Sequence, residues 1–128
     1  EDSEEMGFHR GLGWIEGHVV KMKPPGNLRL PHVGWNSLET TKKEPLFLNI
    51  DSNPSYYFDH TYELVCDTAY TAAKCLYGTA IIAAIQRDNI FATQFHPEKS
   101  QIKGLRLLRN FLNYVESAAP ASQHALIS

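Results

Sequence analysis

The sequence predicts an α/β domain in which several short strands are followed by one C-terminal helix. Runs of apolar and β-branched residues at 18–23, 73–77, 79–86 and 90–95 are separated by turn-forming residues, a pattern typical of strands. After Ser100, apolar residues recur every three or four positions, which indicates an amphipathic helix. With 128 residues and 43% hydrophobic content, the chain is long enough for one compact domain.

The strand-like segments follow one another in a simple order. A glycine-punctuated loop over residues 11–17 leads into the run at 18–23, which stops at the turn formed by Pro24, Pro25 and Gly26. Residues 28–33 predict an extended segment with one buried face, residues 39–44 a charged loop, and residues 46–50 a short apolar strand. Reversals at Gly78 and at Asp88-Asn89 connect the last three runs, which we expect to be neighbouring strands of two hairpins.

The C-terminal helix is expected to begin after Ser100, whose side chain can cap the first turn. Apolar residues at helical spacing predict the stripe that packs on the sheet, and these residues are Ile102, Leu105, Leu108, Leu112 and Val115. Lys103 and Arg106 are then expected to face solvent. Small and polar residues dominate 117–128, so we assign residues 1–116 to the folded domain and expect a frayed tail after it.

Composition argues against several classes of function. A net charge of -2 and a pI near 6.3 give no overall attraction to nucleic acid or to an anionic membrane. The aromatic residues around 56–62 lack the accompanying Lys and Arg that binding to nucleic acid requires. No apolar run reaches the length of a membrane span. We therefore expect a cytoplasmic protein that binds neither nucleic acid nor membrane and acts on a small neutral or zwitterionic substrate.

The two cysteines give no sign of catalysis or metal binding. Cys66 and Cys75 lack metal-ligand spacing, and neither has the flanking glycines of a strained nucleophile turn. We interpret both as small core residues, with a disulfide between them as the less favoured alternative. We expect no metal and no cofactor.

The segment FATQFHPEKS (91–100) is the strongest candidate for chemistry, because a strand-like run ends there in an ionisable pair. If the backbone stays extended beyond Phe95, the side chains of His96 and Glu98 point to the same side, and Pro97 between them ends the strand pairing. The histidine can then act as a base, while the glutamate holds its ring in one tautomer. The alternative is a solvated turn, which is the commoner meaning of a His-x-Glu pair.

Several further segments resemble one enzyme family. FATQFHPEKS followed by a leucine-rich helix resembles the end of a class I glutamine amidotransferase domain. The segments GLGWI (11–15), LPHVGWN (30–36), YFDHTY (57–62) and AAIQR (83–87) are similar to parts of the glutaminase subunit of imidazole glycerol phosphate synthase. The likeness runs from about residue 1 to residue 114. It implies an open, mainly parallel sheet flanked by helices, present here as a partial domain.

The resemblance implies a Cys-His-Glu triad that His96 and Glu98 complete. In the family, the cysteine lies on a G-x-C-x-G turn that precedes the part matched here, so we expect a chain truncated at its front. Thr61 and Tyr62 match positions that border the glutamine pocket, largely through backbone groups. Glu5 matches an acidic position that holds the α-ammonium group of glutamine, and its alternative is an exposed helix residue.

The resemblance also implies a partner protein. Trp35 and Asn36 match a segment near the cyclase, as do Tyr57 and Lys99, whereas by residue type alone Trp35 is more typical of a core. We expect a glutaminase that forms a heterodimer with a synthase or cyclase subunit, to which it delivers ammonia, most simply in histidine biosynthesis. The 128-residue chain alone is expected to be inactive, and to be poorly stable or to associate.

Two alternatives stay open. The first is the paralogous glutaminase that supplies ammonia for amidation of a nucleotide sugar in surface-polysaccharide synthesis, which Asp59, Gly13 and Trp14 favour. The second is a non-catalytic partner-binding fragment, because the cysteine nucleophile is absent.

Overall fold

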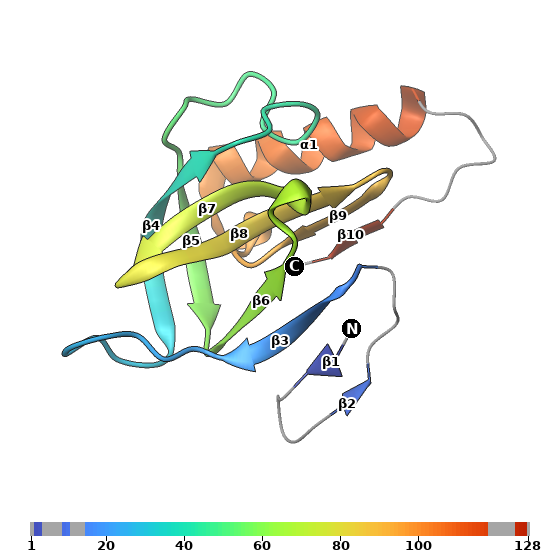
Figure 1. The fold of residues 1–128 in the computed structure, drawn as a ribbon. Coiled ribbons are helices and arrows are strands. Elements are labelled where there is room, and N and C mark those ends of the chain that lie inside the picture. Colours follow the sequence, from blue (N-terminus) through green and yellow to red (C-terminus); the bar gives the residue numbers. More distant parts are fainter. Residues whose placement is uncertain (1, 4–8, 11–14, 118–124, 128) are drawn as a thin grey trace.

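The structure is a computed structural model that describes residues 2–3, 9–10, 15–117 and 125–127. In this part of the chain, two sheets and one long helix form the fold (Figure 1). The smaller sheet has the order β2-β1-β3-β6 and consists of β1 (Asp2–Ser3), β2 (His9–Arg10), β3 (Gly17–Lys21) and β6 (Tyr62–Cys66). The larger has the order β10-β9-β8-β7-β4-β5 and consists of β4 (His32–Thr40), β5 (Ser55–His60), β7 (Thr71–Tyr77), β8 (Thr79–Arg87), β9 (Ile90–Thr93) and β10 (Ala125–Ile127).

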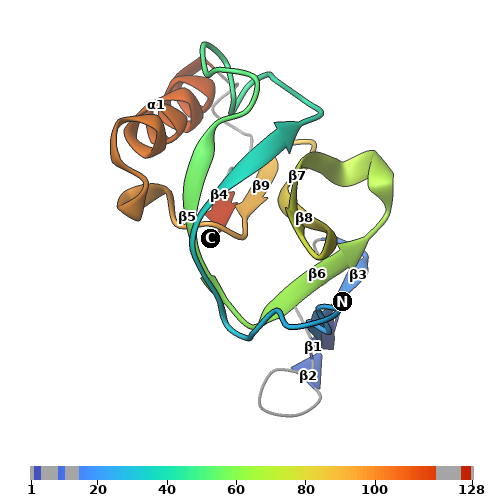
Figure 2. The same ribbon diagram turned by 90° about the vertical axis from the view of Figure 1, so that its left-hand side faces the viewer.

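Helix α1 (Gln101–Ser117) follows β9 after a short 3-10 helix, η2 (Pro97–Lys99); a second 3-10 helix, η1 (Thr68–Tyr70), precedes β7. Figures 1 and 2 place α1 on one side of the larger sheet and the β3–β6 pair on the other. No helix of the described residues is long and apolar enough to cross a membrane.

Most strand pairs are antiparallel, which corrects the expectation of a mainly parallel sheet. In the part that the structure describes, only β1 with β3 and β9 with β10 run parallel. Tight turns join β7 to β8 and β8 to β9, and such short connections can join only antiparallel neighbours. The observed fold is therefore a strand-rich partial α/β domain with one C-terminal helix.

The two predicted hairpins are confirmed. Tyr77 pairs with Thr79 across Gly78, and Arg87 pairs with Ile90 across Asp88-Asn89. Gly78 has a φ of 78° and Asp88 a φ of 54°, the left-handed backbone that tight turns of this kind require. The hairpins bring β7, β8 and β9 together and so carry the chain to His96.

Two other strand predictions hold in part or not at all. In the segment 28–33, Leu30 packs against the core and His32 is buried, but β4 begins only at His32 and Leu28 is 42% exposed. The segment 46–50 forms consecutive turns instead of a strand. Its buried residues are Leu46, Phe47 and Ile50, a spacing that does not alternate as a half-buried strand requires. The predicted loop at 39–44 begins later, because β4 continues to Thr40.

Helix α1 is present as predicted, but it buries a different face. Gly104 and Leu107 are buried, and Phe111 and Tyr114 pack against the core from the same side. The predicted stripe does not pack on the sheet, since Ile102 is 76%, Leu105 64% and Leu112 58% exposed. Leu108 and Val115 are half-buried.

Part of the segment 117–128 forms regular secondary structure. Ser117 is the last residue of α1, and β10 pairs in parallel with β9 through Ala125, Leu126 and Ile127, which lie opposite Ile90, Phe91 and Ala92. Residues 118–124 and 128 lie outside the described part of the chain. The division into residues 1–116 and 117–128 stays a prediction.

Candidate active site around His96

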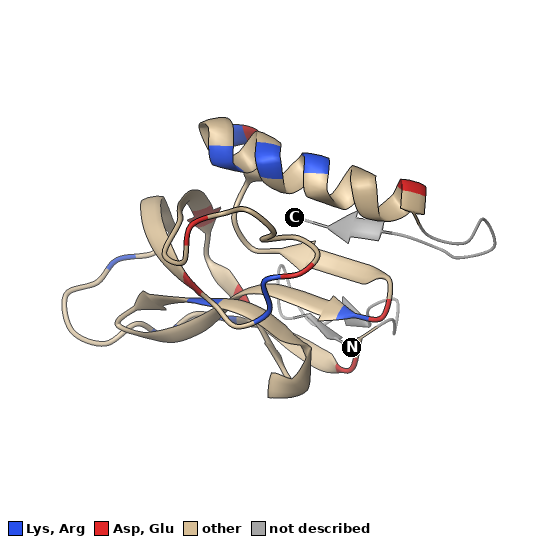
Figure 3. Cartoon of the chain, turned by 90° about the horizontal axis from the view of Figure 1, so that it is seen from above, with Lys and Arg blue, Asp and Glu red and all other residues tan. Residues whose placement is uncertain are grey.

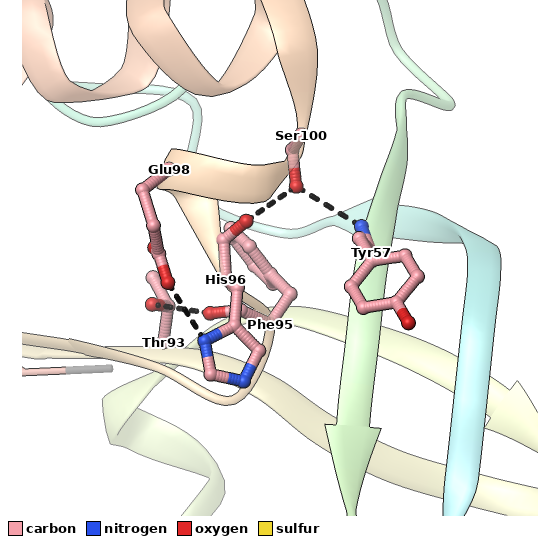
Figure 4. A network of polar contacts seen from close by, with 6 residues as sticks. All are labelled: Tyr57, Thr93, Phe95, His96, Glu98 and Ser100. Carbon is pink, nitrogen blue, oxygen red and sulfur yellow. Dashed lines mark hydrogen bonds and ion pairs between the residues drawn. The ribbon is translucent and has the colours of Figure 1, made fainter.

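His96 and Glu98 form a hydrogen-bonded pair just beyond the end of β9. Nδ1 of His96 lies 2.8 Å from Oε1 of Glu98 (Figure 4). The His96 side chain is 29% exposed and that of Glu98 is 54% exposed, so the pair lies at the surface and is reachable from solvent. The contact that the sequence predicted is therefore present.

The backbone of this pair differs from the prediction. The extended strand stops at Thr93, and Pro97, Glu98 and Lys99 form the 3-10 helix η2. Pro97 is suited to the first helical position, because its φ is fixed and it has no N–H to leave unpaired. The turn, rather than strand alternation, brings the carboxylate of Glu98 back to the ring of His96.

The charge state of Glu98 sets the tautomer of His96. Burial alone would raise the pKa of Glu98, but its own backbone N–H, His96 and Lys99 outweigh that effect and lower the pKa overall. An ionised carboxylate only accepts hydrogen bonds, so Nδ1–H of His96 is the donor. The second ring nitrogen, Nε2, points away from Glu98 in Figure 4. This arrangement suits a base or proton carrier oriented by a carboxylate.

Strand β5 fixes the position of the His96 backbone. The His96 N–H donates to the Tyr57 carbonyl at 2.9 Å. The Ser100 hydroxyl accepts from the Tyr57 N–H at 3.0 Å and donates to the His96 carbonyl at 2.6 Å (Figure 4). Ser100 is 1% exposed, so these bonds are shielded from water. Its side chain does not cap α1 as predicted but ties the His96 turn to β5.

Packing beneath the pair supports the same turn. Phe95 is fully buried and stacks on Tyr56 with ring centroids 4.3 Å apart, while the Thr93 hydroxyl donates to the Phe95 carbonyl at 3.0 Å. Helix α1 approaches so closely at Gly104 that a Cβ there would lie 1.8 Å from the Pro97 carbonyl oxygen. Only glycine allows this approach.

The predicted glutamine-binding residues lie at the junction of the two sheets. Thr61 is the bend between β5 and β6, and Tyr62 is the first residue of β6; both are half-buried. The Thr61 carbonyl accepts from the Met22 N–H at 3.0 Å. Strand β5 links this junction to the His96–Glu98 pair, because β5 ends at His60 and its Tyr57 carbonyl accepts from the His96 N–H. Glu5 lies outside the described residues.

Three of the four predicted partner-facing residues are brought together. Trp35 and Tyr57 are directly opposite in the β4–β5 register, with ring centroids 6.0 Å apart, and Nζ of Lys99 lies 6.0 Å from the centroid of the Tyr57 ring. Trp35 is 50% exposed, so its interpretation as a core residue is wrong. Asn36 follows Trp35, but its side chain turns to β7 and donates to the Leu76 carbonyl at 2.8 Å.

Neither cysteine is prepared to act as a nucleophile. Cys75 is buried, and Cys66 is partly exposed; both are free thiols, so the disulfide alternative is not formed. Burial and then the charge of Glu63 raise the pKa of Cys75 to about 12, while burial and the charge of Asp67 raise the pKa of Cys66. A nucleophilic cysteine needs the opposite shift.

Sequence reasoning missed Ser100 and Gly104 as supports of the site, as well as the buried pair of His32 and His60. The separation of 43 positions between Ser100 and Tyr57 leaves no local pattern to read. Gly104 interrupts an otherwise good helix sequence, which was an available signal for close packing. Both histidines lie within the quoted motifs LPHVGWN and YFDHTY, but no residue rule pairs them.

The fold and the His96–Glu98 pair define a class of protein. Residues 14–115 match the family described as "Glutamine amidotransferase class-I", and the chain belongs to that family. A Thermoplasma acidophilum protein provisionally assigned as a component of GMP synthase has a similar fold, with a TM-score of 0.63 and 25% identity over 80% of this chain and 50% of its own.

The chain is also similar to curated subunits of imidazole glycerol phosphate synthase. The chain is 49% identical over 112 residues to imidazole glycerol phosphate synthase subunit HisH 1 of Campylobacter jejuni (strain RM1221), covering 88% of this chain and 56% of the relative. It is 43% identical to subunit HisH 2 of Vibrio vulnificus (98% and 58% covered) and 45% identical to HisH of Methanocaldococcus jannaschii (88% and 56% covered). The chain thus spans about half the length of the curated relatives it matches.

Proposed function

We propose that this chain is part of a HisH-like glutaminase subunit that hydrolyses glutamine and delivers ammonia to a cyclase partner in imidazole glycerol phosphate synthase. The observation that carries the proposal is the 2.8 Å contact between His96 and Glu98 at the end of β9, in a chain of the class I glutamine amidotransferase family. The identity of 43 to 49% to HisH subunits supports the histidine pathway.

In the proposed reaction, Nε2 of His96 takes the proton of a thiol from sequence outside this chain, because the thiols of Cys66 and Cys75 have raised pKa values. The resulting thiolate attacks the side-chain amide carbon of glutamine. His96 protonates the departing nitrogen, and ammonia leaves behind a glutamyl thioester. Water then attacks the thioester while Nε2 of His96 takes its proton, which releases glutamate and regenerates the thiolate. Glu98 holds Nδ1–H throughout and stabilises the protonated ring.

The remaining predicted site residues take supporting roles in this proposal. Thr61 and Tyr62 border the glutamine through their backbone, and Glu5 holds its α-ammonium group. Ammonia must leave without meeting water, because ammonium is no longer nucleophilic. Trp35, Asn36, Tyr57 and Lys99 provide the partner surface, and the exposed ring of Trp35 against the half-buried ring of Tyr57, with Lys99 beside it, supports that role.

Charged residues on the rest of the surface say less about where a partner protein binds. Basic residues recur along α1 at Lys103, Arg106 and Arg109, while acidic residues are scattered over strands, loops and the end of α1 (Figure 3). Arg106 and Arg109 are exposed, in keeping with an ordinary solvated face. The proposed partner surface is therefore the cluster of aromatic residues and Lys99 rather than the basic side of α1.

The test is glutaminase activity of the complete protein that contains this chain, measured alone and with its candidate partners. Stimulation by a cyclase of the histidine pathway, weakened in Trp35→Ala and unchanged in the control Val65→Ala on the exposed part of β6, supports the proposal. Stimulation only by a nucleotide-sugar amidotransferase would favour the paralogous glutaminase. Binding to the cyclase without any glutamine hydrolysis would favour the non-catalytic alternative.

A further inference from the structure

A buried pair of histidines lies beside the site and has no part in the chemistry proposed above. His32 is the first residue of β4 and His60 the last of β5, and the two are directly opposite in the strand register. Nδ1 of His32 lies 2.8 Å from Nε2 of His60. The residues are 3% and 9% exposed, so water does not satisfy their polar atoms.

The contacts of the pair admit one arrangement of protons. Nδ1 of His60 lies 2.8 Å from the Tyr62 carbonyl, which can only accept, so Nδ1 carries the hydrogen. In a neutral ring, Nε2 of His60 is then an acceptor and receives a hydrogen bond from Nδ1–H of His32. That leaves Nε2 of His32 as an acceptor for the Asn36 amide, whose nitrogen lies 3.3 Å away. The four ring nitrogens thus all have partners, and none retains a lone pair for a metal ion.

The surroundings keep both rings uncharged. Burial and then the charge of His60 lower the pKa of His32 to about 4. Burial also lowers the pKa of His60, aided by the charge of His96, against opposing effects of the Tyr62 carbonyl and Asp59. A second proton on either ring would turn an accepting nitrogen into a donor, so that two N–H donors would face each other and a hydrogen bond would be lost.

Packing fixes the orientation of the His32 ring. It stacks between Phe58 and Tyr77, with centroid distances of 4.7 and 4.1 Å and interplanar angles of 22° and 25°. The Tyr77 hydroxyl in turn donates to the Arg29 carbonyl. The imidazole cannot rotate away from His60 without displacing an aromatic ring on either side.

The two ends of this hydrogen-bonded chain lie at different parts of the proposed site. One end is the Tyr62 carbonyl, in the segment proposed to border glutamine. The other is Asn36, beside Trp35 on the proposed partner surface, and the same Asn36 amide also holds the Leu76 carbonyl of β7. The chain therefore joins β5, β4 and β7 through polar groups.

We propose that His32 and His60 are positioning residues, which as a neutral pair in a single tautomeric state hold the Thr61–Tyr62 segment in place relative to Asn36. Their effect on glutamine is indirect and passes through the Tyr62 backbone, and this part of the inference rests on the proposed function. It predicts that damage to the pair weakens glutamine binding more than it slows the chemical steps at His96.

The first test is NMR of the imidazole nitrogens in the complete protein at pH 7, with His96 as a reference. Both His32 and His60 are expected to be neutral with the proton on Nδ1, and this readout does not depend on any activity. An Nε2–H tautomer on either ring, or a charged ring at pH 7, would overturn the inference even if the protein proved to be a glutaminase.

The second test compares two substitutions of His60 in glutaminase assays. His60→Asn retains an amide donor near the position of Nδ1 and so can keep the bond to the Tyr62 carbonyl, whereas His60→Phe cannot. His60→Phe is expected to raise the KM for glutamine roughly three- to tenfold with a smaller change in kcat, in line with the loss of one hydrogen bond. His60→Asn should lie nearer to wild type.

Equal KM values in wild type and in a folded His60→Phe variant would contradict a positioning role, as would a fall in kcat alone. If wild type hydrolyses no glutamine with any partner, the proposed function fails, and with it the link to glutamine. The NMR measurement would still decide whether the neutral pair exists.

Discussion

At the scale of single residues, the geometry of His96 comes from two separate sets of contacts. Glu98 fixes the ring through Nδ1, and Tyr57 with Ser100 fixes the backbone. Because the two sets hold different parts of the residue, a change in one leaves the other in place. Substitutions can therefore separate the electrostatic role of Glu98 from the structural role of the turn.

We expect Glu98→Gln to lower kcat for glutamine hydrolysis in the complete protein. The amide keeps the shape of the side chain but loses the charge that stabilises a protonated His96. A loss of about 10- to 100-fold in kcat with little change in KM is expected for a base that loses its orienting carboxylate. The matched control is Glu116→Gln on the exposed side of α1. Full activity of Glu98→Gln would rule out this role for the carboxylate.

The sequence was informative about residues that act within a short segment and uninformative about distant supports. The pair of His96 and Glu98 could be found from its spacing and from a family likeness. The local sequence predicts that Ser100 caps the helix, because serine is preferred directly before a helix. Its actual partner, Tyr57, lies 43 positions earlier, and only tertiary structure brings the two together.

At the scale of elements, α1 shows why periodicity predicts a helix more reliably than its buried face. Leucine, isoleucine and aromatic residues occur on both sides of α1, so two stripes compete for the core. The aromatic side, with Leu107, Phe111 and Tyr114, packs against Phe91 and its neighbours. The tight hairpins were predictable for the opposite reason, because their turn residues act locally.

Gly104→Ala provides a sharp test of how α1 supports the site. In an exposed helix interior, this substitution normally stabilises by about 1 kcal/mol. Here the added Cβ would overlap the Pro97 carbonyl, so we expect destabilisation of at least about 2 kcal/mol together with loss of activity. Thermal unfolding measures the effect, and Asn113→Ala at an exposed position of the same helix is the control. A more stable Gly104→Ala variant would contradict the observed packing of α1 on η2.

At the scale of the whole molecule, the described residues leave large apolar side chains in contact with water. Ile102, Leu105 and Leu112 share the outer face of α1, and Leu76 is 68% exposed on β7. Contiguous exposed apolar surface favours association. The chain also spans about half the length of its curated relatives. These facts agree with the expectation that residues 1–128 alone associate or are poorly stable.

We predict that the 128-residue chain self-associates at micromolar concentration. Replacing Ile102 and Leu105 by glutamate should shift the chain toward monomer, because both side chains lie outside the core. Sedimentation velocity measures which oligomeric species are present. Asn53→Glu in an exposed loop is the control for adding the charge of one glutamate elsewhere on the surface. A wild-type chain that sediments as a monomer and unfolds in one sharp transition would count against the prediction.

The buried histidines make stability depend on pH. The pKa of His32 is lowered from 6.5 to about 4 in the folded state, so the unfolded chain binds more protons between these values. The contribution of His32 to the free energy of unfolding is therefore fully present above about pH 6.5. It falls as the pH decreases toward 4, by up to about 3 kcal/mol. Unfolding of the complete protein from pH 7 to 4 should show a shallower decline in His32→Asn. Parallel curves would show that His32 does not contribute.

The most direct test of the central claim is ammonia release from glutamine by the complete protein with its cyclase partner. It compares wild type, His96→Ala and the control His18→Ala, at an exposed position of β3. The proposal predicts release by wild type and by the control, and a loss of about 100-fold or more in His96→Ala. Equal rates in all three proteins would show that His96 does not carry the reaction.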